Sequence, residues 1–382
     1  MQLPPSKLPN VGLTIFSKMS ALAAERSAIN LSQGFPDYNG PQALLDSVGR
    51  QVSAGFNQYA PMPGMPALRE AIAAKIGALY QRRVDPETEI TVTPGATEAI
   101  FTAISACVSK GDEVIIFDPA YDSYRPAVEL NGGVAINLPL LPPDFAIDWA
   151  RVRAAVTART RMILINTPHN PTGQVWSSRD LDELEACVRD TDILLLSDEV
   201  YEHLIFDDLE HQSMNRRTAL AERSFIVSSF GKTFHVTGWR IGYCVAPKTL
   251  MAEFRKLHQY VTFNTHTPLQ CAVAEFMQLQ PDYPLSLPAF FAAKRDRLAT
   301  GLAQSRFKLL NSSGTYFQLV DYTGISDLPD DQFVIWLLER AGVAAIPLSP
   351  FYANGQQTGC IRLCFAKQDE TLDRALEGLC SI

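Results

Sequence analysis

The chain has 382 residues, of which 47% are hydrophobic, and a net charge of −8. This composition is that of a globular protein and excludes a fibrous or disordered one, and the length favours a large domain with a smaller companion. A net negative chain offers no general basic field for phosphate backbones or acidic membranes, so we expect no nucleic-acid partner.

The opening segment MQLPPSKLPNVGL has no apolar stretch behind a basic one, and no run of about 18 apolar residues follows. We therefore expect no membrane partner and a cytoplasmic location. The seven cysteines are odd in number and form no CxxC pair, which favours reduced thiols over a disulfide framework. Cys360 and Cys364 are interpreted as core residues, with a metal site as the alternative; we expect no metal.

Short apolar runs alternate with helical segments between residues 90 and 247. This alternation predicts an α/β fold with a mostly parallel sheet between helices. The runs are apolar almost throughout, so we expect strands that are buried on both faces. They occupy residues 113–117, 161–165, 192–197, 224–229 and 240–246.

Helical spacing of apolar residues predicts helices over 15–29, 97–109, 178–190 and 249–263. The third of these helices begins behind a Ser-x-x-Asp pattern that resembles a capping box. The helices inside the alternating region should cover the predicted sheet.

The proline-rich stretch 278–288 predicts a hinge between two domains. Beyond it the pattern reads helix, strand, strand, helix, strand, strand and helix, which predicts a compact α+β unit. We predict a large domain over 38–283 and a small domain formed by 1–37 together with 284–382.

Polar residues follow several of the predicted strands, where a parallel sheet binds its ligands. Each has an ordinary explanation when taken alone, as a turn, a helix cap or a solvated lysine. Together they supply a lysine amine, a carboxylate, amide and hydroxyl donors, an aromatic face and an anion site, which an electron-sink cofactor requires. They lie in Asp118–Tyr121, Asn166–Gly173, Asp198–Tyr201 and Ser228–Lys232.

Three motifs carry a specific resemblance: SxxGKxxxxxGxRxGY over 228–243, NxPHNPTG over 166–173 and SDEVY over 197–201. Together they resemble the class I/II aminotransferases of fold type I, which depend on pyridoxal 5′-phosphate (PLP). The resemblance runs from GFPD at 34–37 to the segment around Arg362. The chain is most similar to the branch of bacterial methionine aminotransferases and kynurenine or glutamine transaminase K.

The resemblance implies a role for each matching residue around the cofactor ring. Lys232 would form the Schiff base and carry the proton between substrate and cofactor. Asp198 would face the pyridine nitrogen, Asn170 and Tyr201 would hydrogen-bond the phenolic oxygen, and Tyr121 would stack on the ring.

The cofactor phosphate would bind where a loop enters a helix. The backbone of Gly95, Ala96 and Thr97 stands at such a position, so the helix dipole would favour the dianion. Ser229 and Arg240 match the remaining phosphate ligands of the family.

Tyr59 matches a tyrosine that reaches the phosphate in the neighbouring subunit, which implies a homodimer. An exposed tyrosine in a turn is the alternative interpretation.

Arg362 matches the arginine that binds the substrate carboxylate, with Asn170 and the backbone of Gly34 as helpers. The segment 260–270 contains no arginine, although the aspartate-specific branch brings a second one there. Dicarboxylic donors are therefore disfavoured.

Neutral sulfur-containing, aromatic or amide side chains follow as the expected substrates. Phe16, Phe263 and His266 are candidates for the substrate pocket, and ordinary packing is the alternative for each.

We therefore expect a transaminase that moves amino groups to 2-oxo acids by a ping-pong mechanism. A carbon–sulfur β-lyase acting on cysteine conjugates remains the alternative within PLP chemistry, and a PLP-binding regulator without turnover is a remote one. The sequence GKT at 231–233 lacks the leading glycine of a phosphate-binding P-loop, since position 226 is Ile226. A GxGxxG dinucleotide motif after a strand is also missing, which argues against a nicotinamide dehydrogenase.

Overall fold

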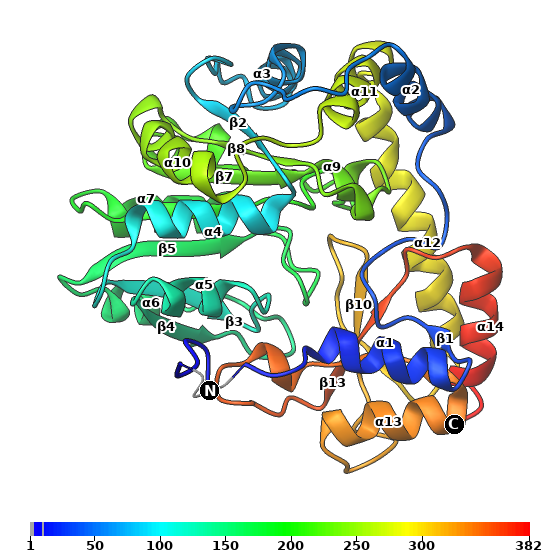
Figure 1. Ribbon diagram of the computed structural model, residues 1–382. Coiled ribbons are helices and arrows are strands. Elements are labelled where there is room, and N and C mark those ends of the chain that lie inside the picture. Colours follow the sequence, from blue (N-terminus) through cyan, green and yellow to red (C-terminus); the bar gives the residue numbers. More distant parts are fainter. Residues whose placement is uncertain (1–3, 10) are drawn as a thin grey trace.

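The computed structural model describes residues 4–9 and 11–382. A seven-stranded sheet in the order β2-β8-β7-β6-β5-β3-β4 forms the upper left of Figure 1. Neighbouring pairs from β4 to β7 are parallel, and β8 runs antiparallel to both of its neighbours. The predicted α/β class with a mostly parallel sheet is confirmed. The strands are β2 (Ile90–Thr93), β3 (Glu113–Asp118), β4 (Val134–Pro139), β5 (Thr160–Asn166), β6 (Leu194–Asp198), β7 (Ser224–Ser229) and β8 (Gly242–Val245).

The central strands are buried on both faces, as their unbroken apolar runs predict. In β3, Val114 and Ile116 pack into one apolar cluster, whereas Ile115 and Phe117 pack into another on the opposite face. Successive side chains of a strand point to opposite faces, so one run of sequence supplies both clusters. The helices around this sheet are α2 (Gln42–Ser53), α3 (Pro66–Tyr80), α4 (Ala96–Cys107), α5 (Tyr124–Leu130), α6 (Trp149–Ala155), α7 (Ser178–Val188), α8 (Thr218–Ala221), α9 (Phe230–Thr233), α10 (Lys248–Val261) and α11 (Thr267–Leu279).

Local signals position several of these helices. The capping box before α7 is confirmed: Ser177 Oγ accepts from the Asp180 N–H, and the Asp180 carboxylate accepts from the Ser177 N–H at 2.8 Å. α4 follows Gly95, whose φ of +84° lets the chain turn sharply from β2 into the helix. The capping box and Gly95 therefore fix where α7 and α4 begin beside the sheet.

A second sheet of four antiparallel strands, in the order β12-β13-β10-β9, lies at the lower right of Figure 1. Three strands rather than two separate its last two helices, because β11 and β12 are short strands on either side of Ala345. The elements are α12 (Leu287–Leu302), β9 (Lys308–Leu309), β10 (Phe317–Asp321), α13 (Asp330–Ala341), β11 (Val343–Ala344), β12 (Ile346–Pro347), β13 (Cys360–Cys364) and α14 (Asp369–Leu379).

The N-terminal helix α1 (Ile15–Glu25) is shorter than the predicted 15–29. Ser27 adopts a left-handed conformation with φ of +50°, so the chain leaves the helix and enters β1 (Ile29–Asn30). β1 pairs in parallel with β11, which attaches the N-terminal segment to the C-terminal unit. Our division into domains over 38–283 and over 1–37 with 284–382 stays a prediction.

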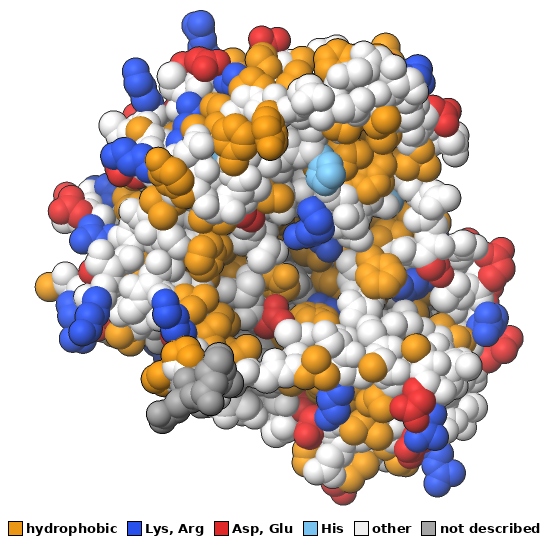
Figure 2. Space-filling view, in the orientation of Figure 1, with side chains coloured by type: hydrophobic (Ala, Val, Ile, Leu, Met, Phe, Trp, Pro, Cys, Tyr) orange, Lys and Arg blue, Asp and Glu red, His pale blue; other side chains and the backbone are white. Residues whose placement is uncertain are grey.

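Short single-turn helices occupy Met214–Arg216, Thr237–Trp239, Tyr283–Ser286 and Ser349–Phe351. Among the helices of the described residues, none combines the length and apolarity needed to cross a bilayer. The space-filling view in Figure 2 shows a face that is hollowed near its centre, with charged side chains around the hollow.

Candidate active site

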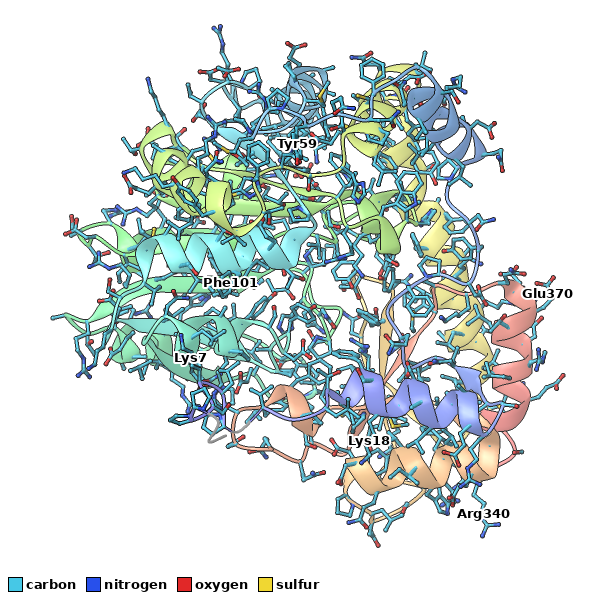
Figure 3. All side chains as sticks on the ribbon, viewed as in Figure 1. Lys7, Lys18, Tyr59, Phe101, Arg340 and Glu370 are labelled. Carbon is cyan, nitrogen blue, oxygen red and sulfur yellow. The ribbon has the colours of Figure 1, made fainter. Side chains whose placement is uncertain are left out.

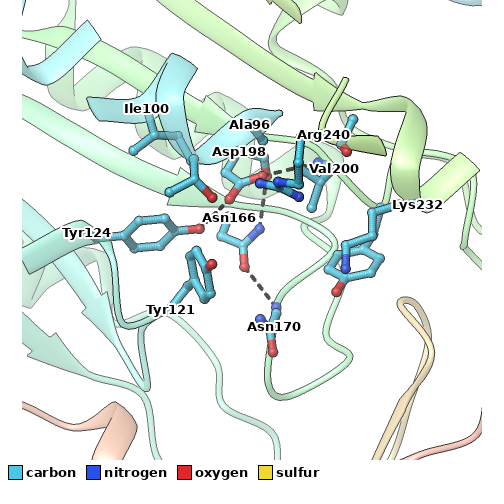
Figure 4. Close-up of a pocket in the computed structure, with 13 residues that line it drawn as sticks. Ala96, Ile100, Tyr121, Tyr124, Asn166, Asn170, Asp198, Val200, Lys232 and Arg240 are labelled. Carbon is cyan, nitrogen blue, oxygen red and sulfur yellow. Dashed lines mark hydrogen bonds between the residues drawn. The ribbon is translucent and has the colours of Figure 1, made fainter. Parts of the chain in front are cut away.

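A pocket lies beyond the carboxyl ends of β5, β6 and β7, where the parallel strands end together (Figure 4). The first turn of α4 and the segment after β3 close its other sides. Its lining residues are Ala96, Thr97, Ile100, Tyr121, Tyr124, Asn166, Asn170, Asp198, Val200, Tyr201, Ser229, Lys232 and Arg240.

Lys232 stands in α9, the single turn that follows β7 directly. Its Nζ donates to the Tyr316 hydroxyl at 2.7 Å and to the Gly34 carbonyl at 3.1 Å. Burial lowers the pKa of Lys232 to about 8, and the cations Arg240 and Arg362 act in the same direction. A neutral, nucleophilic amine is therefore accessible to this lysine close to neutral pH.

Asp198 ends β6 with a carboxylate that is 4% exposed. Tyr124 donates its hydroxyl proton to Oδ2 at 2.6 Å, and the Val200 N–H donates to Oδ1 at 3.2 Å. Burial raises the pKa of Asp198 to about 6, against the opposing effect of these hydrogen bonds. Within the described residues no basic side chain forms an ion pair with this carboxylate, so it can accept a cation from a ligand.

Asn170 and Arg362 meet at the side of the pocket. The Arg362 guanidinium is 1% exposed and donates from Nη1 to Asn170 Oδ1 at 2.7 Å and from Nη2 to the Ser32 carbonyl at 3.0 Å. Its Nε is buried and has no hydrogen-bond partner among the described residues, and its Cζ lies 3.8 Å from the centre of the Phe317 ring. A buried guanidinium that keeps unused donors suits a planar anionic ligand.

The start of α4 and the segment before β8 form an anion cradle. A Cβ added to Gly95 would stand 2.6 Å from Nη2 of Arg240, so a larger residue would displace the guanidinium from this position, and the φ of +84° also favours glycine. Ala96 and Thr97 open the helix, whose free N–H groups and dipole favour an anion. Ser229 is the residue that immediately precedes α9 and lines the same pocket.

Arg240 differs in one respect from its sequence-based interpretation. The run 240–246 was predicted to be a strand, but β8 begins only at Gly242. Arg240 has a left-handed backbone with φ of +52°, and its Nη1 donates to the Thr237 carbonyl at 3.2 Å. The left-handed turn, rather than a strand, carries its side chain toward Gly95.

Most of the predicted site residues come together. Gly34 contacts the pocket through its carbonyl bond to Lys232, and Phe16 packs its ring 5.4 Å from the Arg362 guanidinium. The other predicted ring, phosphate and carboxylate ligands line the pocket or contact residues that do.

Tyr59, Phe263 and His266, which were also predicted to be site residues, do not line the Lys232 pocket. Tyr59 is 82% exposed, and Figure 3 shows it on the upper part of the molecule. It packs edge-on against Phe263, with ring centres 5.3 Å apart, and lines a separate surface hollow with His266. Within one chain, these residues do not reach Lys232.

Sequence reasoning missed three residues that contact the core of the site. Tyr124 holds Asp198, Asn166 accepts from the Asn170 N–H at 2.8 Å, and Tyr316 holds Lys232. Asn166 opens the marked segment Asn166–Gly173, so its polar side chain was a usable signal, whereas Tyr124 lies just beyond the marked segment Asp118–Tyr121. Tyr316 comes from the second sheet, and no local pattern pointed to it.

The assembled groups fit PLP. Lys232 would hold the aldehyde, Asp198 the ring nitrogen, and the cradle of Gly95 and Arg240 the phosphate. Two observations support the fit: the buried carboxylate of Asp198 has no cationic partner in the part of the chain that the structure describes, and Gly95 leaves room for the Arg240 guanidinium.

Comparison with known proteins agrees with this geometry. The family described as aminotransferase class I and II matches residues 26–379. Methionine aminotransferase of Escherichia coli is 51% identical over 377 residues, which cover 99% of this chain and 98% of that protein. Kynurenine–oxoglutarate transaminase 1 of Mus musculus is 33% identical and covers 100% and 98% of the two chains.

Two solved structures have closely similar folds over the whole chain. The crystal structure of YbdL from Escherichia coli, for which a methionine aminotransferase function was identified, has a TM-score of 0.97 at 50% identity and full coverage of both chains. An aspartate aminotransferase from Thermus thermophilus with maleate has a TM-score of 0.91 at 32% identity, again covering both chains fully.

Proposed function

Because this chain belongs to the class I and II aminotransferases and is thus a PLP-dependent amino acid transaminase, we propose that it prefers neutral sulfur-containing or aromatic L-amino acids. It passes their amino group to a 2-oxo acid in a ping-pong reaction. The observation that carries this proposal is that a largely buried amine and a buried carboxylate line one pocket, while a buried guanidinium bonds to Asn170 at the side of that pocket.

The bound cofactor supplies an aldehyde carbon that exchanges between amines and a ring that withdraws electrons from the substrate α-carbon. Lys232 holds the cofactor and then moves a proton to and from that carbon. Its lowered pKa supports this role, since a fully charged ammonium could not accept the proton. Tyr316 and Gly34 hold the amine in place between these steps.

The remaining polar groups orient the ring and the phosphate. Asp198 keeps the ring nitrogen charged, and Tyr124 fixes the carboxylate that does so. Asn170 and Tyr201 bind the phenolic oxygen, while Tyr121 stacks on the ring face. The phosphate ligands we propose are Gly95, Ala96, Thr97, Ser229 and Arg240.

Arg362 binds the substrate carboxylate, with Asn170 and the backbone of Gly34 beside it. Phe16, Phe317 and Phe351 surround the guanidinium, so the adjoining space is apolar. Such walls support neutral substrates, as does the absence of arginine from 260–270. The identity to the methionine aminotransferase of Escherichia coli, which exceeds that to the aspartate enzyme of Thermus thermophilus, points the same way.

The active form we propose is a homodimer in the cytoplasm. Tyr59 is exposed and lies away from Lys232 of its own chain, which supports a place at the neighbouring active site. His266 shares its surface hollow and Phe263 packs against its ring, and both would join the partner's substrate pocket. The seven cysteines are all unpaired, which suits a reducing compartment.

A screen of the twenty protein amino acids together with kynurenine tests the proposal. Each is added to the PLP-loaded protein, and loss of the long-wavelength cofactor absorbance is followed, with Lys232→Ala as the blank. We expect methionine, phenylalanine, glutamine and kynurenine to react and aspartate hardly to react. Fast turnover of aspartate would overturn the substrate preference while leaving the transaminase itself intact.

The same preparation separates transamination from β-elimination. The reported relatives are transaminases, which favours transfer. We expect a cysteine conjugate to aminate a 2-oxo acid faster than it releases ammonia and pyruvate. The opposite ratio would favour the β-lyase.

A further inference from the structure

A second cavity, of about 380 Å³, lies between α3, the end of α11 and the turn Tyr283–Ser286. α3 and α11 both lie along the top of Figure 1. This cavity shares no lining residue with the cofactor pocket. It is lined by Ala71, Ala74, Lys75, Ala78, Leu79, His203, Phe234, Met277, Gln278, Gln280, Pro281, Asp282, Pro284 and Leu285.

The lining has the character of a small-molecule site. Most of its side chains are apolar. The polar residues are Lys75, His203, Gln278, Gln280 and Asp282. Pockets of about 300–1,000 Å³ with this composition are the usual binding sites for small ligands. An apolar lining alone does not identify the ligand. The polar side chains His203 and Lys75, which also line the cavity, indicate its chemical class.

His203 is the first of these groups. It is 8% exposed, lines the cavity, and forms no side-chain hydrogen bond with any described residue. Its closest charged neighbour is Glu202, with Nε2 and Oε1 3.7 Å apart, beyond hydrogen-bond distance. Burial lowers the pKa of His203 to about 4, so at neutral pH the ring offers one N–H donor and one nitrogen acceptor.

Lys75 is the second. Its Nζ donates to Glu202 Oε1 and to the Tyr243 hydroxyl, both at 2.5 Å, which leaves one of its three protons unused. Glu202 also accepts from Tyr80 at 2.8 Å and from Ser228 at 2.6 Å. The lysine charge is therefore balanced within the protein.

The charge balance selects the class of ligand. A neutral imidazole, a neutralised ion pair and the nearby carboxylate of Asp282 give the cavity no net positive charge. An anion would therefore lose its hydration without gaining a free cation. An uncharged ligand loses less on transfer and can still use the donor protons of Lys75 and His203.

We propose that this cavity is a second small-molecule site, which takes an uncharged aromatic molecule carrying one hydrogen-bonding amide or carbonyl group. The aromatic part contacts the alanines of α3 and Met277, and the polar group contacts Lys75 and His203. Phe234 lies directly beyond the α9 turn that carries Lys232, so an occupant touches the segment that holds the catalytic amine.

Titration calorimetry on the PLP-loaded protein tests the proposal without requiring turnover. The probes are benzamide, benzoate and toluene, which are similar in shape and differ in charge and hydrogen bonding. We expect benzamide to bind at least about tenfold more tightly than either of the others. No binding of benzamide, or tighter binding of benzoate, would overturn the proposal.

Three variants, one of them a control, test whether the probe binds in this cavity. Ala71→Phe fills the cavity and should weaken benzamide at least about tenfold, whereas Ala67→Phe, on the same helix but outside the cavity, should not. His203→Phe keeps an aromatic ring but removes both the N–H donor and the nitrogen acceptor, so it should weaken benzamide by a similar factor. Equal binding to all variants, or displacement of benzamide by a saturating 2-oxo acid, would show that the probe binds elsewhere.

Discussion

Arg362 donates to Asn170 across 2.7 Å, and this hydrogen bond joins two sheets. Arg362 belongs to β13 of the C-terminal sheet, whereas Asn170 follows β5 of the seven-stranded one. The residue that we propose to bind the substrate carboxylate is thereby held against the one that we propose to bind the cofactor ring. On this proposal, the relative position of the two sheets sets the distance between substrate and cofactor.

Replacing Arg362 with lysine should impair substrate binding selectively. Lysine cannot present two parallel donors to a carboxylate, and each lost charged hydrogen bond costs about 1.5–3 kcal/mol. We expect kcat/KM for methionine to fall about 10- to 150-fold, while the affinity for PLP changes little. Steady-state kinetics and cofactor titration measure the two effects.

Arg340→Lys, at an exposed position on α13 (Figure 3), is the matched control and should change neither quantity. An Arg362→Lys variant with normal kcat/KM would rule out carboxylate binding by this residue.

The sequence predicted best those residues whose positions follow from chain order alone. Asn170, Asp198 and Lys232 follow three strands that proved to be adjacent and parallel, β5, β6 and β7. Parallel strands bring their carboxyl ends to one edge, so marking the strands also marked the pocket. The same logic placed Tyr121 after β3.

Residues from the second sheet were harder to predict. Tyr316 reaches Lys232 and Phe317 stacks on Arg362, yet both contacts span more than 40 positions of the chain. The apolar pattern of β10 predicts that the strand is buried. It does not indicate which element of the other sheet packs against it. Only Arg362 was identified there, because a charge inside an apolar strand is unusual and because it matched a family motif.

Tyr124 shows a different limit of prediction from the sequence. It lies just after the marked segment that ends at Tyr121, and both tyrosines line the pocket, but only Tyr124 binds Asp198. The direction of a side chain at a helix start depends on its rotamer and on packing with neighbours. Spacing along the sequence could mark the segment but could not assign the two tyrosines to different roles.

The pH dependence of cofactor capture should report the pKa of Lys232. Only the neutral amine attacks the aldehyde, and burial lowers this pKa to about 8. We expect the rate of PLP capture by the cofactor-free protein to rise about tenfold per pH unit below 8 and to level off above 9. Stopped-flow absorbance follows the rate.

An ordinary lysine, with a pKa of about 10.4, would give a rate that keeps rising past pH 10. Lys75 is also buried, but its ion pair with Glu202 raises its pKa. A profile without a plateau near pH 9 would therefore contradict a neutral Lys232.

Asp198→Asn should stabilise the cofactor-free protein at high pH. Burial raises the pKa of Asp198 from 3.8 to about 6, so the folded chain binds this proton more tightly than the unfolded chain does. The contribution of this group thus favours folding below pH 4 and is lost as the pH rises through 6. Above pH 7 the ionised carboxylate costs on the order of 2–3 kcal/mol, which asparagine avoids.

Urea unfolding of the two cofactor-free proteins at equal concentration measures the difference. We expect a more stable variant at pH 8, a near-equal pair at pH 4, and much lower turnover of the variant with PLP. A variant that is less stable at pH 8 would show that the carboxylate does not carry this cost.

A mixture of two inactive variants should regain activity if Tyr59 serves the neighbouring subunit. Tyr59→Asp places a carboxylate where the cofactor phosphate would bind, and Lys232→Ala removes the amine. In a mixed dimer with a shared site, one active site carries both lesions and the other carries neither. Random mixing of equal amounts then restores about a quarter of the wild-type sites.

The opposite arrangement has a distinct outcome. If Tyr59 acted in its own chain, each site of a mixed dimer would carry one lesion, and the mixture would stay inactive. The exposure of Tyr59 and its contact with Phe263 favour recovery, because neither residue lines the Lys232 pocket of its own chain. Transamination of methionine after denaturation and joint refolding, compared with each variant refolded alone, measures the result.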